Sequence, residues 1–565
     1  MKPTFSSLLG FPGSRLVPAL LKSIKSLARG LLPIMAISFG GVAACQGCHG
    51  ATTGTAAGPH DEPASPTLRI YIVSDLAGAL EPCGCVKDQL GGMDHFAAWV
   101  TSEKTKAPAN VLVSAGPLFF LDPVLKDDKR AQDVAKASTI ASSMADLGLA
   151  GFAPGKNDFV AGLPELERFR TESKGSLVMA NVAGEGILPA WRGPVVREIN
   201  GVKLGLLGVS APDRAEGGAP TGFNVTSPID AVKGNVATLR AQGAQVLVLL
   251  AAVGRGEAKR IADAVPELTA IVVGSPGGSG DANSETPPAE RIGNVLIAET
   301  GNHLTTAAAL DLFVRDGSYA FADGTGLDLA RKRSDVMRRI DEMRGKIAQW
   351  EGDRKVAEAD VKARKADLAV LEKERAELDK VPTPAKGSFF RYRVQEVRES
   401  LGKDSAVTDR MLAYYKQVND ANKREFANKM PQPARKGDAS FVGVDTCTTC
   451  HDDARKVWDK TAHAHAYATL SNQFKEYNLD CVSCHVTGYD LPGGSTVTHV
   501  ENLKNVQCEV CHGPGSKHVA SPAKVKMPIE RPQPDSCLAC HHPPHVHEFD
   551  AVRKMEDILG PGHGR

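Results

Sequence analysis

The chain has 565 residues, a formal net charge of +1 and 24% charged residues. This length predicts several domains, because single hydrophobic cores rarely grow beyond about 250 to 300 residues. The balanced charge gives no reason to expect a nucleic-acid partner, and any protein partner would be steered by local patches of charge.

The first 44 residues have the composition of a secretory signal. Residues 1–29 carry basic but no acidic side chains, and a short apolar run that ends in small residues follows them. This order predicts a signal peptide at 1–44, and the apolar run is too short for a confident transmembrane helix. We therefore expect the chain to be exported.

Cys45 has two interpretations that exclude each other. Val-Ala-Ala-Cys at 42–45 resembles a bacterial lipobox, in which Cys45 becomes the lipidated first residue of the mature chain. Cys45, Cys48 and His49 also form Cys-x-x-Cys-His, a haem-attachment motif, and a thiol that carries lipid cannot carry haem. The low-complexity segment 45–67 is typical of a tether that holds a lipoprotein away from a membrane, which favours the lipid.

Residues 68–325 alternate between short apolar runs and helical stretches, which predicts an α/β domain. Apolar runs that are bounded by Gly, Pro, Asp or Asn predict strands. These runs lie at 68–73, 110–114, 176–181, 203–209, 245–250, 270–273 and 294–298. Helices are predicted at 229–242 and 257–265.

The order of these elements resembles the metallophosphoesterase domain of periplasmic 5'-nucleotidases, which implies an α/β sandwich. Residues 72–78 stand where that family has Asp-x-His-Gly, and residues 155–159 stand where it has Gly-Asn-His-Glu-Phe. Only Asp75 remains of the metal ligands. The other ligand positions hold Ala77, Pro117, Asn157, Ala252, Ser275 and Gly277. Because a two-metal phosphatase needs several His and carboxylate ligands, we expect a scaffold that does not hydrolyse phosphoesters.

Cys83 and Cys85 form a Cys-Gly-Cys motif after the first predicted strand. Two cysteines one residue apart can close a strained disulfide, which is easy to reduce. The pair is therefore a thiol redox couple, a soft-metal site, a structural disulfide or a pair of inert thiols. It resembles the motif of phosphatase-like multihaem cytochromes in which selenocysteine can replace a cysteine, which implies a redox role. His95 is a candidate neighbour.

Residues 326–435 are predicted to form a helical spacer. Residues 328–380 are almost free of Gly and Pro, and nine of twelve heptad a and d positions are apolar. This predicts a coiled-coil helix of roughly 80 Å. A short strand is expected at 389–396 and a second helix at 405–430, with Leu412, Tyr415 and Val418 packing back on the first helix. Coiling between two chains into a homo-oligomer is the alternative.

Residues 436–565 contain four Cys-x-x-Cys-His motifs. The cysteines are Cys447, Cys450, Cys481, Cys484, Cys508, Cys511, Cys537 and Cys540, and the adjacent histidines are His451, His485, His512 and His541. Two thiols at this spacing reach two porphyrin vinyl groups, and the adjacent imidazole ligates the iron. Zinc fingers instead place their His pair a dozen or more residues away. We therefore predict four covalently bound haem c groups in a mainly helical and irregular domain.

Eight further histidines compete for the distal iron positions. They are His463, His465, His499, His518, His542, His545, His547 and His563. Two imidazoles on one iron give low-spin iron suited to electron transfer, whereas an open position permits small-ligand chemistry.

The runs at 441–443, 458–467, 484–488 and 507–518 resemble the tetrahaem cytochrome c-554 family. The resemblance implies distal roles for His463, after the first motif, and for His518, in Gly-Pro-Gly-x-x-His. One haem of that family is five-coordinate, commonly the second, which points to the motif of His485. The imidazole-rich run 541–547 departs from the family pattern, and its His545 and His547 are further distal candidates.

The sequence predicts an exported, lipid-anchored multihaem cytochrome on the periplasmic face of a bacterial membrane, with the outer membrane as one location. It would pass electrons between a protein donor and a protein acceptor in a periplasmic or cell-surface respiratory chain. The alternative is a redox enzyme in which an open haem, or the pair Cys83 and Cys85, reduces a small nitrogen or sulfur compound.

Overall fold

The computed structural model describes residues 65–82, 89–215, 217–280, 282–353, 356–381, 386–542, 546 and 549–563. Most of the predicted signal and tether lies outside the described residues. So do five predicted site residues, namely Cys45, Cys83, Cys85, His545 and His547. No helix in the described ranges is long and apolar enough to cross a membrane.

The first sheet has seven strands in the order β14-β15-β13-β1-β2-β3-β4. They are β1 (Leu68–Ser74), β2 (Asn110–Ala115), β3 (Leu149–Ala153), β4 (Ser176–Leu177), β13 (Thr306–Phe313), β14 (Ala322–Asp323) and β15 (Phe389–Glu396). Strands β1 to β4 run parallel, and β13 is antiparallel to β1 and β15. All of β1 is buried, which explains its continuous apolar run.

The second sheet has six strands in the order β11-β12-β10-β9-β7-β6. They are β6 (Val195–Ile199), β7 (Val202–Ser210), β9 (Val246–Ala252), β10 (Ala270–Gly274), β11 (Glu290–Ile292) and β12 (Val295–Ala298). A separate ribbon joins β5 (Val182–Gly184) and β8 (Phe223–Val225). One buried cluster, which includes Ile72 and Leu310 of the first sheet and Leu206 and Val248 of the second, lies between the two sheets.

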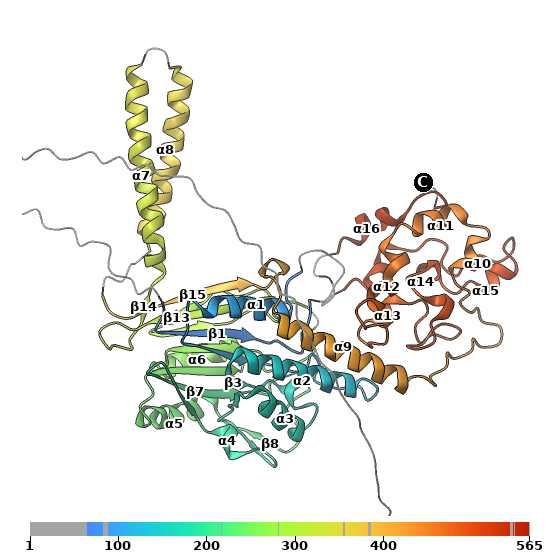
Figure 1. Cartoon of the computed structure of the whole chain (residues 1–565), viewed down its shortest axis with the longest axis horizontal. Coiled ribbons are helices and arrows are strands. Elements are labelled where there is room, and N and C mark those ends of the chain that lie inside the picture. The colour runs from blue at the N-terminus through green and yellow to red at the C-terminus, as the bar shows by residue number, and fades with distance from the viewer. Residues whose placement is uncertain are drawn as a thin grey trace, which may run out of the picture. The chain divides into compact units, whose positions relative to one another are not determined.

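Helices cover the outer faces of both sheets. A second buried cluster joins the first sheet to α1 (Met93–Lys104), α2 (Arg130–Leu147), α3 (Leu163–Ser173) and α9 (Ser405–Glu425). A third joins the second sheet to α5 (Pro228–Ala241) and α6 (Arg255–Ala264). The short η1 (Lys156–Phe159) and α4 (Pro189–Arg192) complete the domain. The predicted α/β sandwich is confirmed, with helix, sheet, sheet and helix as its layers (Figure 1).

The predicted 80 Å helix is wrong, because residues 325–379 fold back as a helical hairpin (Figure 1). α7 (Thr325–Gly352) packs on α8 (Glu358–Asp379) through a buried cluster that includes Ile340 and Leu371. Ion pairs such as Lys332 with Glu374 (3.0 Å) also join the two helices. The heptad pattern shows which face needs an apolar partner, and here a later part of the same chain supplies it.

The rest of the predicted spacer belongs to the sandwich. Residues 389–396 form strand β15, as predicted, but β15 pairs with β13 over eight residues inside the first sheet. Helix α9 buries Met411, Tyr414 and Val418 in the cluster beneath that sheet, whereas Leu412 is 37% exposed. α9 therefore does not pack back on the helical hairpin as expected.

The C-terminal region consists of short helices. They are α10 (Val444–Thr448), α11 (Asp452–Trp458), η3 (Ala462–His465), α12 (Ala466–Ser471), α13 (Val482–His485), η4 (Glu501–Leu503), α14 (Cys508–His512), α15 (Ser516–Ala520), η5 (Pro534–Ala539) and α16 (Ala551–Ile558); η2 (Glu399–Leu401) precedes α9. The apolar cluster of this region is small, with Tyr467, Val482, Val486, Val497 and Val500 as its buried members. A region with so small a core depends on further bonds or bound groups for its stability.

Candidate functional site

Each Cys-x-x-Cys-His motif coincides with a helical turn. Cys508–His512 is helix α14, and the other three motifs overlap α10, α13 and η5. Positions i, i+3 and i+4 of a helix lie on one face, so both thiols and the imidazole can point to the same side. None of the eight motif cysteines, all of which lie in the described ranges, forms a disulfide.

Three of the four motif histidines face a second imidazole from a distant segment. The ring centroids of His451 and His518 are 6.4 Å apart. Those of His463 and His541 are 6.2 Å apart. Those of His512 and His563 are again 6.4 Å apart.

This spacing leaves room for one metal ion between the rings of each pair. With a metal–nitrogen bond of about 2.0 Å and about 1.1 Å from nitrogen to ring centre, two imidazoles on one ion have centroids about 6.2 Å apart. The three observed separations agree with this value within 0.2 Å. The donor set therefore fits an iron porphyrin with two axial imidazoles.

Backbone carbonyl groups orient several of these rings. The Nδ1 atom of His518 lies 2.6 Å from the carbonyl oxygen of Val525, and that of His512 lies 2.8 Å from the carbonyl oxygen of Ile529. An imidazole that donates its Nδ1 proton to a carbonyl presents Nε2 as the metal-binding atom. Burial also lowers the pKa of His463 and of His541, which favours the neutral form that binds metals.

His485 differs from the other motif histidines. Its Nδ1 atom lies 2.6 Å from the carbonyl oxygen of Ala466, so its Nε2 is oriented in the same way. None of the ring pairs found in the described residues includes His485, however. Burial lowers the pKa of this imidazole as well.

Residues of the predicted family motifs join the segments around the first and third turns. The buried carboxylate of Glu509 accepts hydrogen bonds from the backbone N–H groups of Val442, Gly443 and Gly515 at 2.7–3.0 Å. It thereby ties α14 to the chain before the first motif and to the loop that leads to His518. Trp458 donates its indole N–H to the carbonyl oxygen of Val506 at 2.8 Å, which ties α11 to the third motif.

The motifs approach one another in two pairs. The thiols of Cys447 and Cys508 share a hydrogen bond, which lowers the pKa of the Cys508 thiol. The thiols of Cys484 and Cys540 do the same, and the pKa of the Cys484 thiol falls to about 6. The first motif is thus next to the third, and the second is next to the fourth.

In the sandwich, the positions at which the phosphoesterase resemblance expects metal ligands gather at the carboxyl ends of the strands. Asp75 follows β1, and its Oδ1 atom accepts hydrogen bonds from the backbone N–H (2.8 Å) and hydroxyl (3.0 Å) of Ser275, which follows β10. Asn157 donates its amide to the carbonyl oxygens of Leu121 (2.6 Å) and Gly278 (3.0 Å). A Cβ atom at Gly116 would lie 1.8 Å from Asp75 Oδ1, so the packing here is close.

These contacts occupy the polar side chains at the strand ends. The retained carboxylate and the amide of Asn157 are satisfied by hydrogen bonds within the protein. Within the described ranges, no three His, Cys, Asp or Glu side chains are grouped so that they could hold a metal ion. His95, the candidate neighbour of Cys83 and Cys85, is buried, and its Nδ1 atom lies 2.5 Å from the carbonyl oxygen of Gly402.

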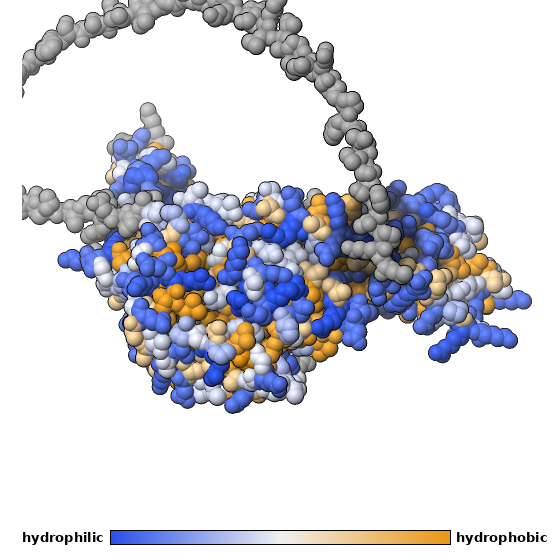
Figure 2. Space-filling view, turned by 60° about the horizontal axis from the view of Figure 1, so that its bottom comes forward, coloured by the Kyte–Doolittle hydropathy of each residue, from blue (hydrophilic) through white to orange (hydrophobic). Residues whose placement is uncertain are grey.

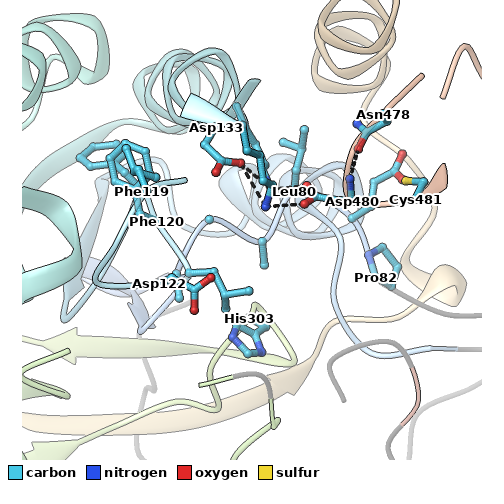
Figure 3. A pocket seen from close by; sticks show the side chains of 18 of the residues that line it. Leu80, Pro82, Phe119, Phe120, Asp122, Asp133, His303, Asn478, Asp480 and Cys481 are labelled. Carbon is cyan, nitrogen blue, oxygen red and sulfur yellow. Dashed lines mark hydrogen bonds and ion pairs between the residues drawn. The ribbon is translucent and has the colours of Figure 1, made fainter. Parts of the chain in front are cut away.

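A cluster of charges joins the sandwich to the second motif (Figure 3). Asp480, which precedes Cys481, pairs with Lys129 and with Lys136 (3.0 Å) of helix α2. Between the two lysines, the amide of Gln132 donates to the Asn478 side chain at 3.2 Å. Burial acts to raise the pKa of Asp480, but the two ammonium groups outweigh it and hold this pKa well below its usual range.

His563 is one of the eight histidines that compete for the distal positions, but it is not among the four that the sequence favours. It lies after α16 and faces His512, whereas the sequence favours His545 and His547 at this end of the chain. Gly560, Pro561 and Gly562 directly precede His563, and a Gly-Pro-Gly run also precedes His518, with two residues between them. This shared tripeptide is the signal in the sequence that could have favoured His563.

Comparison with known proteins agrees with the expectation for the C-terminal region. Residues 446–513 match the family model of cytochrome c554 and c-prime. Cytochrome c-554 of Nitrosomonas europaea is 36% identical over 94 residues, which cover 14% of this chain and 40% of that protein. The chain thus spans less than half the length of this relative. The predicted c554-like region is confirmed, and a c554-like region implies haem c.

Solved structures similar to the chain include two enzymes of low sequence identity. Sulfate thiohydrolase SoxB of Thermus thermophilus is 14% identical, with a TM-score of 0.38, over 46% of this chain and 56% of that one. A 5'-nucleotidase precursor from the same organism is 14% identical, with a TM-score of 0.42, over 76% of this chain and 71% of that one.

The buried carboxyl of Asp75 predicts a pH dependence of stability. Burial raises its pKa from 3.8 to about 7, against the hydrogen bonds from Ser275. Between these two pH values the folded state binds more protons than the unfolded state, so this group makes the free energy of unfolding fall as pH rises. Asp75→Asn should remove a slope of at most about 1.4 kcal/mol per pH unit. Urea unfolding of both proteins between pH 4 and 8 measures it.

Glu198→Gln, at an exposed position on β6, is the control and should leave the slope as it is in the wild type. Parallel curves for wild type and Asp75→Asn across this pH range would contradict the assignment.

Proposed function

We propose that the chain is an exported, membrane-anchored electron carrier with four haem c groups at residues 447–541. The family match supports a multihaem cytochrome electron carrier. The single observation that carries the fuller proposal is the set of three imidazole pairs. The ring centroids of each pair are separated by the distance expected for two imidazoles on one iron. Haem iron with two axial imidazoles supplies one-electron chemistry and little else.

The proposed axial ligands follow from the ring pairs. His518 completes the site of His451, His463 that of His541, and His563 that of His512. Carbonyl groups on Nδ1 fix the tautomer of His518 and of His512, so that Nε2 is the ligating atom. Because no described imidazole faces His485, we propose that its site has an open position.

The two pairs of neighbouring motifs support transfer from haem to haem. Thiol contacts between Cys447 and Cys508, and between Cys484 and Cys540, place the attachment points of each pair side by side. The chain's own residues then fix the distances, because Glu509 and Trp458 join separate motifs through backbone hydrogen bonds.

The location and partners are proposals from the sequence. A basic and then apolar start supports export, and the lipobox-like run that ends at Cys45 supports a lipid anchor, with a fifth haem at Cys45, Cys48 and His49 as the alternative. The partners would be a redox donor and a redox acceptor in a respiratory chain. Homo-oligomers through α7 and α8 are less favoured, because those helices bury their apolar faces against each other.

A second candidate function, that of a redox enzyme, has support from one observation, namely that none of the ring pairs in the described residues includes His485. The open position proposed there would let this site bind a small nitrogen or sulfur compound. The pair Cys83 and Cys85 is the other candidate redox centre.

Intact mass tests the main proposal. The membrane-extracted protein should exceed the mass of its mature polypeptide by four haem masses, plus one diacylglycerol modification at Cys45. A fifth haem mass without lipid would replace the lipid assignment. Purified protein that is colourless and has no added haem mass, from a host that matures c-type cytochromes, would contradict the proposal.

Substituting a distal histidine should change the spin state of one haem. His463→Ala removes the ring that faces His541, so one low-spin haem should become high-spin in electron paramagnetic resonance spectra. His465→Ala is the matched control, because the His465 ring is exposed and contacts the carbonyl oxygen of Asp459. Equal spectra for the two variants would contradict the ligand assignment.

Carbon monoxide should bind at the His485 site alone. The reduced wild-type protein is expected to take up one carbon monoxide, because the other three sites are proposed to have two imidazoles. His463→Ala should take up two, as measured by absorbance titration. Uptake of none by the wild type would remove the open position and with it the main support for the enzyme alternative.

A further inference from the structure

A cavity of about 410 Å³ lies where the sandwich meets the second Cys-x-x-Cys-His motif (Figure 3). Ligand-binding pockets usually measure about 300–1,000 Å³, so this one is large enough for a small organic molecule. It lies at the carboxyl ends of β1 and β2, the edge at which open α/β sheets bind their ligands.

Apolar side chains form much of the cavity wall. Leu80 follows β1, and Phe120, Leu121, Val124 and Leu125 follow β2. Val124 is 72% exposed. On the face drawn in Figure 2, apolar residues lie interspersed among polar ones. A large exposed side chain on a cavity wall is available to a ligand, because the core does not use it.

The charges that line the cavity balance one another once the ion pairs are counted. Lys126, Lys129 and Lys136 contribute three positive charges, and Glu81, Asp122, Asp133 and Asp480 contribute four negative charges, of which that of Glu81 is paired with Lys475. Lys129 and Lys136 pair with Asp133 and Asp480, with N–O distances of 3.0 to 3.9 Å for three of the four pairs. A ligand with a net charge would disturb this balance. The cluster therefore favours a molecule that is uncharged overall.

One hydrogen-bond donor of the cavity wall, the Tyr414 hydroxyl, is available to a ligand. The Tyr414 side chain lines the cavity and is 4% exposed, and its hydroxyl has no hydrogen-bond partner among the described residues. Burial raises the pKa of Tyr414, so the hydroxyl stays protonated and can donate. A buried donor without a partner costs free energy, which a bound acceptor would recover.

The cavity also reaches a redox centre of the proposed function. Cys481, the first attachment residue of the His485 motif, is part of the cavity wall. A hydroquinone held here would lie beside this attachment residue and would reduce the haem iron in two one-electron steps, with release of two protons to water, while the redox acceptor of the proposed function takes the electrons from the haem.

We propose that this cavity binds an uncharged, ring-sized molecule with hydrogen-bond-accepting oxygens, of the quinone class. The ring would pack on the apolar wall of Leu80, Leu121 and Val124, and a carbonyl oxygen would accept a hydrogen bond from the Tyr414 hydroxyl. The binding stands on the cavity itself, and only the exchange of electrons with the haem rests on the proposed function.

Equilibrium dialysis of menadione, a soluble naphthoquinone, against the haem-loaded full-length protein tests the proposal. We expect saturable binding at one site. Tyr414→Phe should raise the Kd roughly 3- to 12-fold, the effect of one hydrogen bond. Tyr392→Phe is the matched control, because Tyr392 also has a buried hydroxyl without a partner in the described residues, but it lies in β15 away from the cavity.

A second pair of variants tests the apolar wall. Val124→Asp places a charge on that wall and should weaken menadione binding at least several-fold. Because Val124 is exposed, this change should not unfold the protein. Val370→Asp, at a residue of α8 that is 67% exposed, should leave the Kd unchanged.

The outcomes separate this inference from the proposed function. Protein with four haem masses that binds no menadione, or binds it equally in all four variants, overturns the inference and leaves the electron carrier intact. Saturable binding of nitrite or sulfite that Tyr414→Phe weakens, without binding of menadione, also overturns it. Menadione binding to protein without haem supports the cavity site while removing the proposed function.

Discussion

The arrangement of the C-terminal region is built around three pairs of imidazoles, whose ring centroids lie 6.2 to 6.4 Å apart, a distance that fits one metal ion between them. His451, His463 and His512 each face a ring from a segment that lies 51 to 78 residues later in the chain, as the numbering of His518, His541 and His563 shows. Carbonyl groups orient the rings, and the Glu509 carboxylate fixes the loops that carry them. With so small an apolar core, the bound groups themselves would form the centre of this region.

The strand ends of the sandwich are held together by hydrogen bonds within the protein. Asp75 still points to the strand ends, but Ser275 now donates two hydrogen bonds to it. Asn157 bridges two loops through backbone carbonyls. Such bonds hold the strand ends in place without a metal ion, and this stable edge supplies half of the cavity that faces the second motif.

Local patterns in the sequence predicted local features well. The buried strands β1, β9 and β10 follow from apolar runs, and the c554-like region follows from the motifs and the runs around them. Features that depend on a partner far along the chain were missed. The apolar stripe along 328–380 does not reveal whether it packs on another chain or whether its first half, α7, packs on its second half, α8. His563 follows Gly-Pro-Gly without the two intervening residues of the family run, and the sequence of β15 shows no sign that it pairs with β13.

The position of Asp480 has a consequence for biogenesis. This residue directly precedes Cys481 and pairs with two lysines of α2, so the peptide that would carry the proposed second haem also joins the C-terminal region to the sandwich. If a haem is attached at this motif, both of its thiols must be accessible at that moment. Attachment would then come before Asp480 pairs with the two lysines, which would set an order between cofactor insertion and docking of the sandwich.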